Sequence, residues 1–415
     1  MKMKHWKSVI LSIFCSALFC FGSAANADEI LIGYSGPVSG IASEYGQDVL
    51  NGIDMAVREI NESGGILVGD KTYSLKLERL DDRADPTQAV NNARRLQSMG
   101  AVAVFNPVFT TTAPMMKINE EKGKEFLVMA YTSTPKIEKL DNKLTIISTP
   151  TFNVYVDVFT DWAIRRGWKT CAMVVTFGAY GDEWSQAFRE AWEKKGGVIT
   201  ISRPANYYMD TDFSAPLTAA IATRPDCMLI GGPSATTALV IEQARQMGFK
   251  GGFIMIDQAK QDVIAKLLGS TKLMGDLIGT GGVLSTSFGT NAFDQRYTKA
   301  YKRMTTWECV LNYVAVNSLA RAIAAAGTVS DIYKIRASFP KAYPLLADKY
   351  PSEFFGITDG GRAKIFGTVQ TVTKGRSDHP FLSCWWAKTP EEFEAVLKVS
   401  LSNSVIKRVW VPVPY

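Results

Sequence analysis

The chain has 415 residues, of which 47% are hydrophobic and 21% charged, so it is long enough for about two or three domains and is neither disordered nor fibrous. Its formal net charge of +6 is small for this length and its basic residues are not clustered, which argues against a nucleic-acid-binding protein.

The first 27 residues have the organisation of a secretory signal peptide. Lys2, Lys4 and Lys7 precede an apolar run from about residue 9 to residue 21, and Ala25-Asn26-Ala27 matches the small-x-small pattern that signal peptidase cleaves. We therefore expect cleavage after Ala27, a mature net charge of +3 and export from the cytoplasm. The apolar run is too short to span a membrane comfortably, although a retained N-terminal anchor is the alternative.

Few residues of the mature chain suit metal or nucleophilic chemistry. Only His379 would remain after cleavage, so the sequence argues against a histidine-based catalytic triad or zinc cluster. Cys171 and Cys227 lie in apolar, strand-like runs and are expected to be buried free thiols, whereas Cys309 and Cys384 could form a disulfide. We expect no enzyme activity, no metal and no cofactor.

In chain order, the apolar pattern alternates between strand and helix. The first series has strands at 29–34, 73–80, 101–105 and 125–130, with helices at 43–65, 86–100 and 111–123. The second has strands at 169–176, 198–202, 226–232 and 252–257, with helices at 180–197, 213–223 and 234–248. Helices are then expected at 293–304 and 309–327, and a strand at 363–373.

Repeated strand–helix units with short, glycine-ended joints predict parallel sheets covered by helices on both faces. Because the two series are separated near residue 150, the sequence predicts an α/β protein with two similar lobes. Residues 381–415 are interpreted as an irregular C-terminal extension.

The stretch from Glu78 to Pro86 contains Asp81, Asp82 and Asp85 in a DDxxD spacing, which on one long helix can bind Mg²⁺ against a diphosphate. The proline forces a helix to begin after these acids, so Asp85 is expected to be the N-cap and Pro86 the N1 residue. Asp81 and Asp82 then fall at the carboxyl end of a strand, where we expect them to be exposed. The three acids are therefore predicted to be structural.

The loop after the first strand contains Gly33, Gly36 and Gly40. Its GxxGxxxG spacing differs from the GxGxxG fingerprint of dinucleotide-binding loops. We interpret it as a turn or ligand-approach loop.

Hydroxyl and aromatic side chains follow the strands of the first series. Thr110 and Thr111 come just before a predicted helix, where a threonine either caps the helix or contributes to a small anion site. Tyr131, Thr132 and Ser133 follow the next strand along the chain. Because ligands bind at the carboxyl ends of strands in open α/β sheets, the two clusters could converge on one site.

The second series has a comparable set of residues, namely Tyr180, Ser234 and Asp257. An aromatic ring, a hydroxyl and one carboxylate are typical of a binding cleft, and no nucleophile–base pair accompanies them.

Several stretches follow the pattern of one known family, in one order. They are ILIGYSGPVSGIASEYGQDVLNGIDMAVREINESGG, LERLDDRADPTQAVNNARRL, AYGDEWSQAFREAWEKKGG, DFSAPLTAAI and ALVIEQARQMGF. With these motifs the chain resembles, over about residues 29–375, the periplasmic leucine/isoleucine/valine-binding proteins, the type I solute-binding proteins of ABC transporters. The resemblance implies two Rossmann-like lobes joined by three crossover segments, with the ligand held between them as they close.

From this resemblance we expect an N-terminal lobe of residues 28–150 and 279–357, and a C-terminal lobe of residues 151–278 and 358–380. The implied function is that of an extracytoplasmic binding protein that delivers a small amino-acid-like or aromatic/carboxylate solute to the permease subunits of an ABC importer. A ligand-sensing module for a membrane kinase or chemoreceptor is the alternative. We expect a monomer.

The resemblance also implies roles for single residues. Tyr45 matches an aromatic residue that covers the ligand, and Thr132 and Ser133 match the pair that binds the main-chain groups of an amino acid. Tyr180 matches an aromatic residue of the second lobe, and Asp257 falls where the family places a carboxylate facing the ligand's ammonium group.

Other positions extend or depart from the family pattern. Asn153 lies by the first crossover, where a polar residue often meets the ligand, and Ser234 stands where branched-chain binders use an aromatic residue. The first serine of the family's carboxylate-binding run aligns with Phe109, with Thr110 and Thr111 just beyond it. Phe109 favours a ligand with apolar bulk, whereas the carboxylate of Asp257 favours a cation. The sequence leaves both kinds of ligand open.

Overall fold

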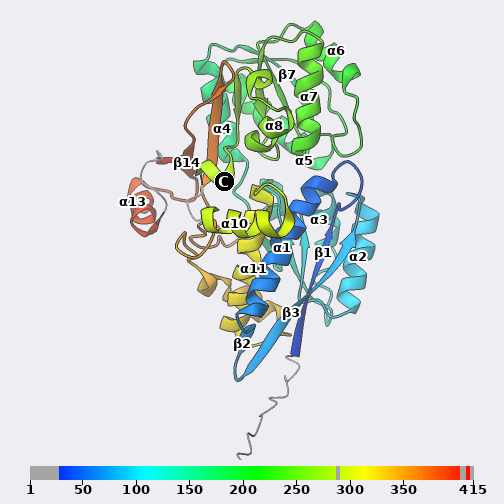
Figure 1. Ribbon diagram of the computed structural model, residues 1–415, viewed down its shortest axis with the longest axis vertical. Coiled ribbons are helices and arrows are strands. Elements are labelled where there is room, and N and C mark those ends of the chain that lie inside the picture. Colours follow the sequence, from blue (N-terminus) through cyan, green and yellow to red (C-terminus); the bar gives the residue numbers. More distant parts are fainter. Residues whose placement is uncertain (1–27, 287–289, 402–407, 412–415) are drawn as a thin grey trace, which may run out of the picture.

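The computed structural model describes residues 28–286, 290–401 and 408–411, which form two α/β halves, each built around its own sheet (Figure 1). We call the part around the N-terminal sheet the first half and the part around the other sheet the second half. The predicted signal peptide and its cleavage site lie outside the described residues.

The sheet of the first half is parallel except at one edge, where the last two strands form an antiparallel hairpin. Its strands, in spatial order, are β2 (Ile66–Val68), β3 (Lys71–Asp81), β1 (Asp28–Gly36), β4 (Ala103–Asn106), β5 (Leu127–Ala130) and β6 (Thr145–Ile147). The helices of this half are α1 (Ser43–Glu62), α2 (Pro86–Ser98), α3 (Phe109–Met115), α9 (Val283–Thr286), α10 (Thr290–Tyr301), α11 (Trp307–Ala326) and α12 (Ile332–Ser338), with 3₁₀ helices η1 (Pro135–Leu140) and η3 (Phe339–Ala342).

The sheet of the second half has a parallel core and an antiparallel edge. Its strands, in spatial order, are β8 (Val198–Ser202), β7 (Thr170–Val175), β9 (Cys227–Gly231), β10 (Gly252–Met255), β11 (Leu277–Gly279), β12 (Gly367–Thr373), β14 (Phe381–Cys384) and β15 (Arg408–Trp410), with β13 (Arg376–Ser377) paired to β12. The helices are α4 (Asn153–Arg165), α5 (Ala179–Lys194), α6 (Ser214–Ala222), α7 (Ser234–Gln246) and α8 (Gln261–Leu267), with the 3₁₀ helix η2 (Lys272–Met274). Helix α13 (Pro390–Val399) has no buried residue, and the Ser400 hydroxyl that follows it donates to Glu353.

The chain passes between the two halves three times. It crosses after β6 into α4, returns after β11 toward α10 and α11, and crosses again between Phe354, in the core of the first half, and β12. The third crossover lies against the first sheet, where Arg362 forms an isolated parallel bridge with Ile147 of β6. The predicted two-lobed α/β fold with three crossovers is therefore confirmed, while the exact lobe boundaries given above remain a proposal.

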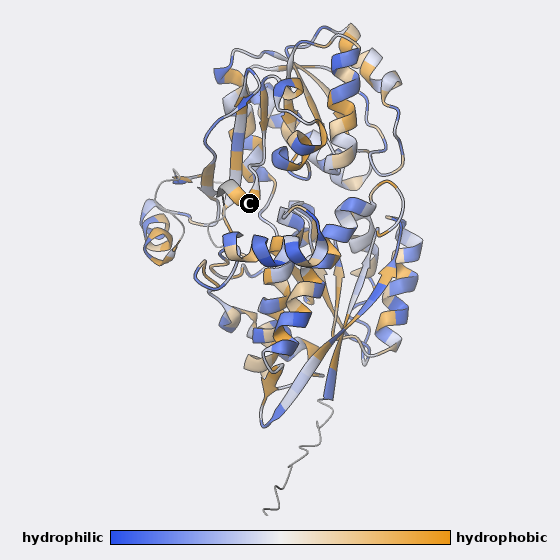
Figure 2. Cartoon of the chain, viewed as in Figure 1, coloured by the Kyte–Doolittle hydropathy of each residue, from blue (hydrophilic) through white to orange (hydrophobic). Residues whose placement is uncertain are grey.

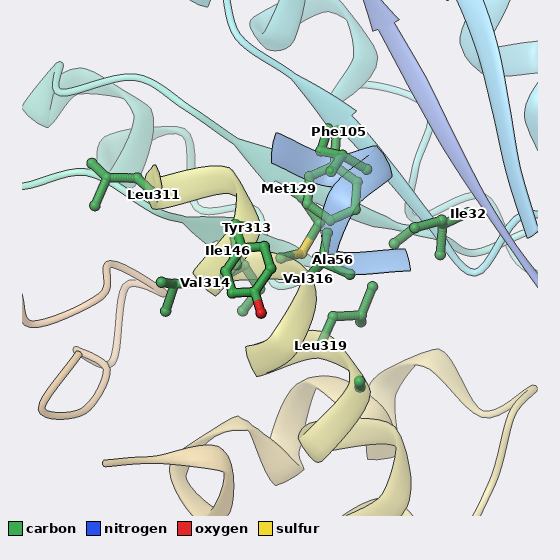
Figure 3. Packing of buried hydrophobic residues seen from close by; sticks show 14 of the residues in the cluster. Ile32, Ala56, Phe105, Met129, Ile146, Leu311, Tyr313, Val314, Val316 and Leu319 are labelled. Atoms are coloured by element: carbon green, nitrogen blue, oxygen red, sulfur yellow. The ribbon is translucent and has the colours of Figure 1, made fainter. Parts of the chain in front are cut away.

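The core of the first half forms where α1 packs along α11. The face of α1 that carries Val49, Ile53 and Ala56 is buried. A Cβ atom at Gly52, in the same helix, would lie 2.2 Å from the backbone oxygen of Cys309 on α11, so the close approach of the two helices requires glycine. Figure 3 shows this core, which includes Ile32, Phe105, Met129, Ile146, Leu311, Val314, Val316 and Leu319.

Among the described residues, α11 is the one helix long and apolar enough to cross a membrane. However, 72% of its most apolar window is buried within the protein, and α11 is the central helix of the first half. Figure 2 shows the general pattern, in which apolar strands lie inside and the outer faces of the helices carry the hydrophilic residues. We therefore interpret α11 as a core helix.

The DDxxD acids organise the loop between β3 and α2. Asp85 is the N-cap of α2 and accepts a hydrogen bond from the backbone N–H of Gln88 at 2.8 Å, as predicted. The prediction that Asp82 is exposed is wrong, because its side chain is 0% exposed. Its carboxylate accepts hydrogen bonds from Ser35 Oγ, the Ala84 N–H and Asn106 Nδ2 at 3.0, 2.9 and 3.1 Å, and thereby joins the ends of β1, β3 and β4.

The helix predicted at 111–123 is shorter and begins earlier, because α3 runs from Phe109 to Met115. The amide oxygen of Asn106 accepts the N–H of Val108, so the chain turns into the helix directly after β4. The hydroxyls of Thr111 and Thr112 bond back to the Val108 carbonyl and the Asn106 amide, and neither caps the helix.

The prediction that residues 381–415 are irregular is wrong for the described part, residues 381–401 and 408–411. Strand β14 pairs with β12, strand β15 pairs with β14, and both extend the sheet of the second half. The possible disulfide is absent, because Cys384 is buried on β14 while Cys309 is buried on α11 in the other half, and both are free thiols. Cys171 and Cys227 are buried free thiols, as predicted.

We predict that Asp82→Ala lowers the free energy of unfolding by about 2 kcal/mol, because three inward-facing donors lose their acceptor. Asp85→Ala removes only a helix cap and is expected to cost about 1 kcal/mol. Chemical denaturation measures both, with Asp348→Ala as the matched change at an exposed carboxylate. If Asp82→Ala and Asp348→Ala were equally stable, the structural role of Asp82 would be wrong.

Candidate ligand-binding site

Residues of both halves enclose a small pocket at the carboxyl ends of the parallel strands. Its volume, the space open to the centre of a water-sized sphere, is about 40 Å³, and two cavities of about 30 and 20 Å³ share lining residues with it. We call it the inner pocket, and it is lined by Tyr45, Pro107, Val108, Phe109, Tyr131, Thr132, Ser133, Thr149, Tyr180, Tyr208, Asp257, Gln258 and Lys260. This location agrees with the general rule for open α/β sheets.

The carboxylate of Asp257 fixes the wall that the second half contributes. Its Oδ1 atom accepts hydrogen bonds from the Tyr180 hydroxyl and, at 2.9 Å, from Trp184 Nε1, both on α5. Burial, and then the charge of Asp257, raise the pKa of Tyr180 well above its usual value, so its phenol stays protonated and donates. Asp257 is thereby oriented toward the pocket by two aromatic side chains.

Polar contacts join the halves beside this wall. The Ser133 hydroxyl, after β5, lies 3.1 Å from the Tyr180 hydroxyl on α5. The Thr134 hydroxyl donates to Glu183 on the same helix, and the backbone N–H of Lys136 donates to Glu183 Oε1 at 3.0 Å. The structure therefore shows the two halves closed on each other.

A buried ion pair lies at the back of the inner pocket and also links the halves. Lys260, between β10 and α8, places Nζ 3.3 Å from Oε1 of Glu308 on α11, and the two side chains are only 7% and 5% exposed. The ammonium group also donates to the backbone carbonyl of Asp257 at 2.5 Å, and Tyr131 donates to Glu308 at 3.4 Å. The ammonium group of Lys260 is therefore already paired and hydrogen-bonded within the protein.

Arg362 positions the loop that carries Thr132 and Ser133. Its guanidinium is fully buried and donates to the backbone carbonyls of Thr132, Thr149 and Pro150 at 3.2, 3.2 and 3.3 Å. It also donates to the Thr134 carbonyl at 2.7 Å and forms an ion pair with Glu138 at 2.9 Å. One side chain of the third crossover thus fixes both the first crossover and one wall of the site.

Two buried polar atoms of the lining have no hydrogen-bond partner among the described residues, namely Thr149 Oγ1 and Gln258 Oε1. The amide nitrogen of Gln258 donates to the Tyr208 hydroxyl at 2.7 Å, which leaves its oxygen as an acceptor. Buried polar atoms are normally satisfied, so these two point to a polar ligand. In the described ranges, no three His, Cys, Asp or Glu side chains are grouped to bind a metal ion.

Seven of the residues predicted for the site line the inner pocket together: Tyr45, Phe109, Tyr131, Thr132, Ser133, Tyr180 and Asp257. Four do not line it. Thr110 lines a separate, larger cavity, and the Thr111 hydroxyl is bonded within α3. Ser234 lines the 20 Å³ cavity and accepts the N–H of Lys260 at 3.0 Å, while Asn153 is the first residue of α4 and lines none of these cavities.

Sequence reasoning did not identify Lys260, Glu308, Gln258 or Arg362. Gln258 and Lys260 come just after Asp257, at the carboxyl end of a strand that the sequence predicts. This position could have indicated that they line the site. Glu308 and Arg362 reach the site from elements distant in sequence, and no local pattern marks them.

Two sheets that close on a polar pocket, joined by three crossovers, define the class of hinge-closing solute-binding proteins. Residues 29–362 match the family model described as periplasmic binding protein. The chain therefore belongs to the periplasmic binding protein family, in the group that contains the Leu/Ile/Val-binding proteins.

Named relatives show the same group. The chain is 29% identical over 327 residues to the Leu/Ile/Val-binding protein BraC3 of Rhizobium johnstonii, which covers 76% of this chain and 84% of the relative. It is 26% identical over 242 residues to the Leu/Ile/Val-binding protein of Escherichia coli K12, covering 58% of this chain and 64% of the relative.

Solved structures share the fold. A leucine-binding protein of Thermotoga maritima superposes with a TM-score of 0.71 at 23% identity, over 85% of this chain and 98% of that one. A solute-binding protein of R. palustris in complex with benzoate gives 0.72 at 16% identity, over 84% and 95%. A branched-chain amino acid binding protein of Streptococcus pneumoniae in complex with isoleucine gives 0.69 at 18% identity, over 86% and 99%.

We predict that Glu308→Gln lowers the free energy of unfolding by about 3 kcal/mol, because it leaves the buried ammonium of Lys260 without its counter-charge. The double variant Lys260→Met/Glu308→Leu removes both charges and is expected to recover most of that loss. Chemical denaturation of both variants and the wild type measures the effect. A double variant as unstable as Glu308→Gln would show that the ion pair itself is not the cause.

Proposed function

We propose that this protein is the extracytoplasmic substrate-binding protein of an ABC importer and that it binds a small, amino-acid-like solute through an ammonium group. The proposal rests on the acceptors of the inner pocket, because Asp257 and Gln258 both line it and the Gln258 amide oxygen has no hydrogen-bond partner among the described residues. The cation of the lining, Lys260, is already paired with Glu308. A primary ammonium group, with one positive charge and three donors, complements this arrangement.

The remaining polar groups suit the rest of an amino-acid-like ligand. The Thr149 hydroxyl has no partner among the described residues, and Thr132 also lines the pocket, so hydroxyl groups of the first half can bond to a carboxylate or amide. Tyr45 and Tyr131 supply aromatic surface, with ring centroids 6.2 Å apart. Relatives named for leucine, isoleucine and valine, and the neighbour solved with isoleucine, support a solute of this class.

An aromatic carboxylate is the second candidate. Phe109 in the lining favours it, and the R. palustris neighbour was solved with benzoate. Such an anion needs an available cation, and the commitment of Lys260 to Glu308 weighs against it.

Export and delivery belong to the same proposal. We propose that residues 1–27 direct export, that the mature protein is monomeric, and that its closed form docks on a permease rather than on a sensor kinase. Because the ligand is bound without chemical change, the protein is not proposed to be an enzyme. Closure then depends on contacts with the ligand that only the closed state provides, such as those that Tyr180 and Asp257 would make.

Thermal melting with L-leucine, L-isoleucine, L-valine and L-phenylalanine tests the ligand class. Each is paired with the acid that lacks the amino group, and benzoate is included. We expect at least one amino acid to raise the melting temperature increasingly with concentration, and its des-amino partner to have no effect.

Asp257→Asn is expected to weaken binding of that amino acid by roughly tenfold or more, since a hydrogen bond to a charged group contributes about 1.5–3 kcal/mol. Asp348→Asn is the matched exposed control and should bind like the wild type. Stabilisation by benzoate and the des-amino acids, but by none of the amino acids, would overturn the proposed ammonium site in favour of the second candidate.

A further inference from the structure

A larger cavity adjoins the inner pocket and has Tyr180 in its lining. Its volume is about 520 Å³, and we call it the outer cavity. Its walls include Val108 and Thr110 from the first half, and Phe177, Tyr180, Tyr208 and Met209 from the second. Like the inner pocket, it is thus enclosed by both halves and exists only where they close.

The outer cavity and the inner pocket share a wall. Val108, Tyr180 and Tyr208 line both spaces. Both tyrosines form hydrogen bonds with residues that line the inner pocket: Tyr180 donates to Asp257, and Tyr208 accepts from Gln258. A group bound next to Asp257 and Gln258 therefore contacts the same side chains that line the outer cavity.

The inner pocket is much the smaller of the two spaces. Its volume is about 40 Å³, against about 520 Å³ for the outer cavity measured in the same way. The two adjoining cavities, of about 30 and 20 Å³, are smaller still. The outer cavity is the space at this interface that accommodates a bulky substituent.

The walls of the outer cavity are suited to an apolar group. Phe177 and Met209, which line it, are 53% and 64% exposed, and exposed apolar side chains that gather at a hollow mark binding sites. The charged lining residues, Arg83 and Asp85, belong to the exposed loop before α2. The buried Thr176 hydroxyl, which also lines the cavity, has no hydrogen-bond partner among the described residues and can bond to one polar atom of an occupant.

We propose that the outer cavity binds an apolar substituent of the solute whose ammonium group lies in the inner pocket. The ligand is then an amino-acid-like molecule with an extended aliphatic or aromatic substituent, larger than the side chain of valine. This inference rests on the proposed function for the ammonium end, whereas the apolar subsite itself rests on the cavity alone.

The subsite is tested first with a probe that needs no ammonium site, the fluorescent dye 1-anilinonaphthalene-8-sulfonate. The wild type is expected to bind the dye with enhanced emission, and Phe177→Asp and Met209→Asp to reduce its affinity at least fivefold. Leu67→Asp is the matched control, because Leu67 is 63% exposed on β2, remote from the cavity. If Leu67→Asp reduced dye binding as much as the two cavity variants, or if none of them did, the subsite would be refuted.

The link between the two spaces is tested by calorimetry with L-alanine, L-norleucine and L-2-aminooctanoic acid. Each added methylene group buried in the outer cavity is expected to tighten binding to the wild type about fourfold, which corresponds to about 0.8 kcal/mol. In Phe177→Asp the affinity for L-2-aminooctanoic acid should fall at least fivefold while that for L-alanine stays within twofold.

The two experiments separate the subsite from the proposed function. Binding of L-alanine without any increase along the series would overturn the inference and leave the proposed ammonium site intact. Dye binding that depends on Phe177, together with no binding of any amino acid, would support the apolar subsite and overturn the ammonium proposal.

Discussion

A single buried guanidinium, that of Arg362, connects the hinge of this protein with its binding site. It comes from the third crossover and donates to carbonyls of the first crossover and of the loop after β5. A buried cation must be paired and hydrogen-bonded, and here Glu138 and four backbone oxygens meet that requirement. The loop that carries Thr132 and Ser133 is therefore fixed to the crossover segments.

The side chains that face this fixed loop come from the second half, and each is oriented by a partner of its own. Asp257 is positioned by Tyr180 and Trp184, and Lys260 reaches across to Glu308. Ligand contacts can shift an open–closed equilibrium only if they differ between the two states, and contacts from both halves satisfy that condition. The unpartnered atoms of Thr149 and Gln258 are the places where a solute would complete the hydrogen bonding.

Much of the fold could be predicted from the sequence, because strand and helix periods are local and the joints between them are marked by glycine and proline. The N-cap role of Asp85 could be predicted because Asp85 directly precedes Pro86, at the start of a helix. The burial of Asp82 could not be predicted in this way, since its donors Ser35 and Asn106 come from two other strands. The same limit explains why the pairing of Lys260 with Glu308 was missed, since these residues lie far apart in the chain.

The central claim is that the two halves close around a small solute and that residues of both halves bind it. Small-angle X-ray scattering of the mature protein, with and without the amino acid that stabilises it most, tests this most directly. The account predicts a smaller radius of gyration when the ligand is present, since binding favours the closed form. Scattering curves that stay identical at saturating ligand would contradict it.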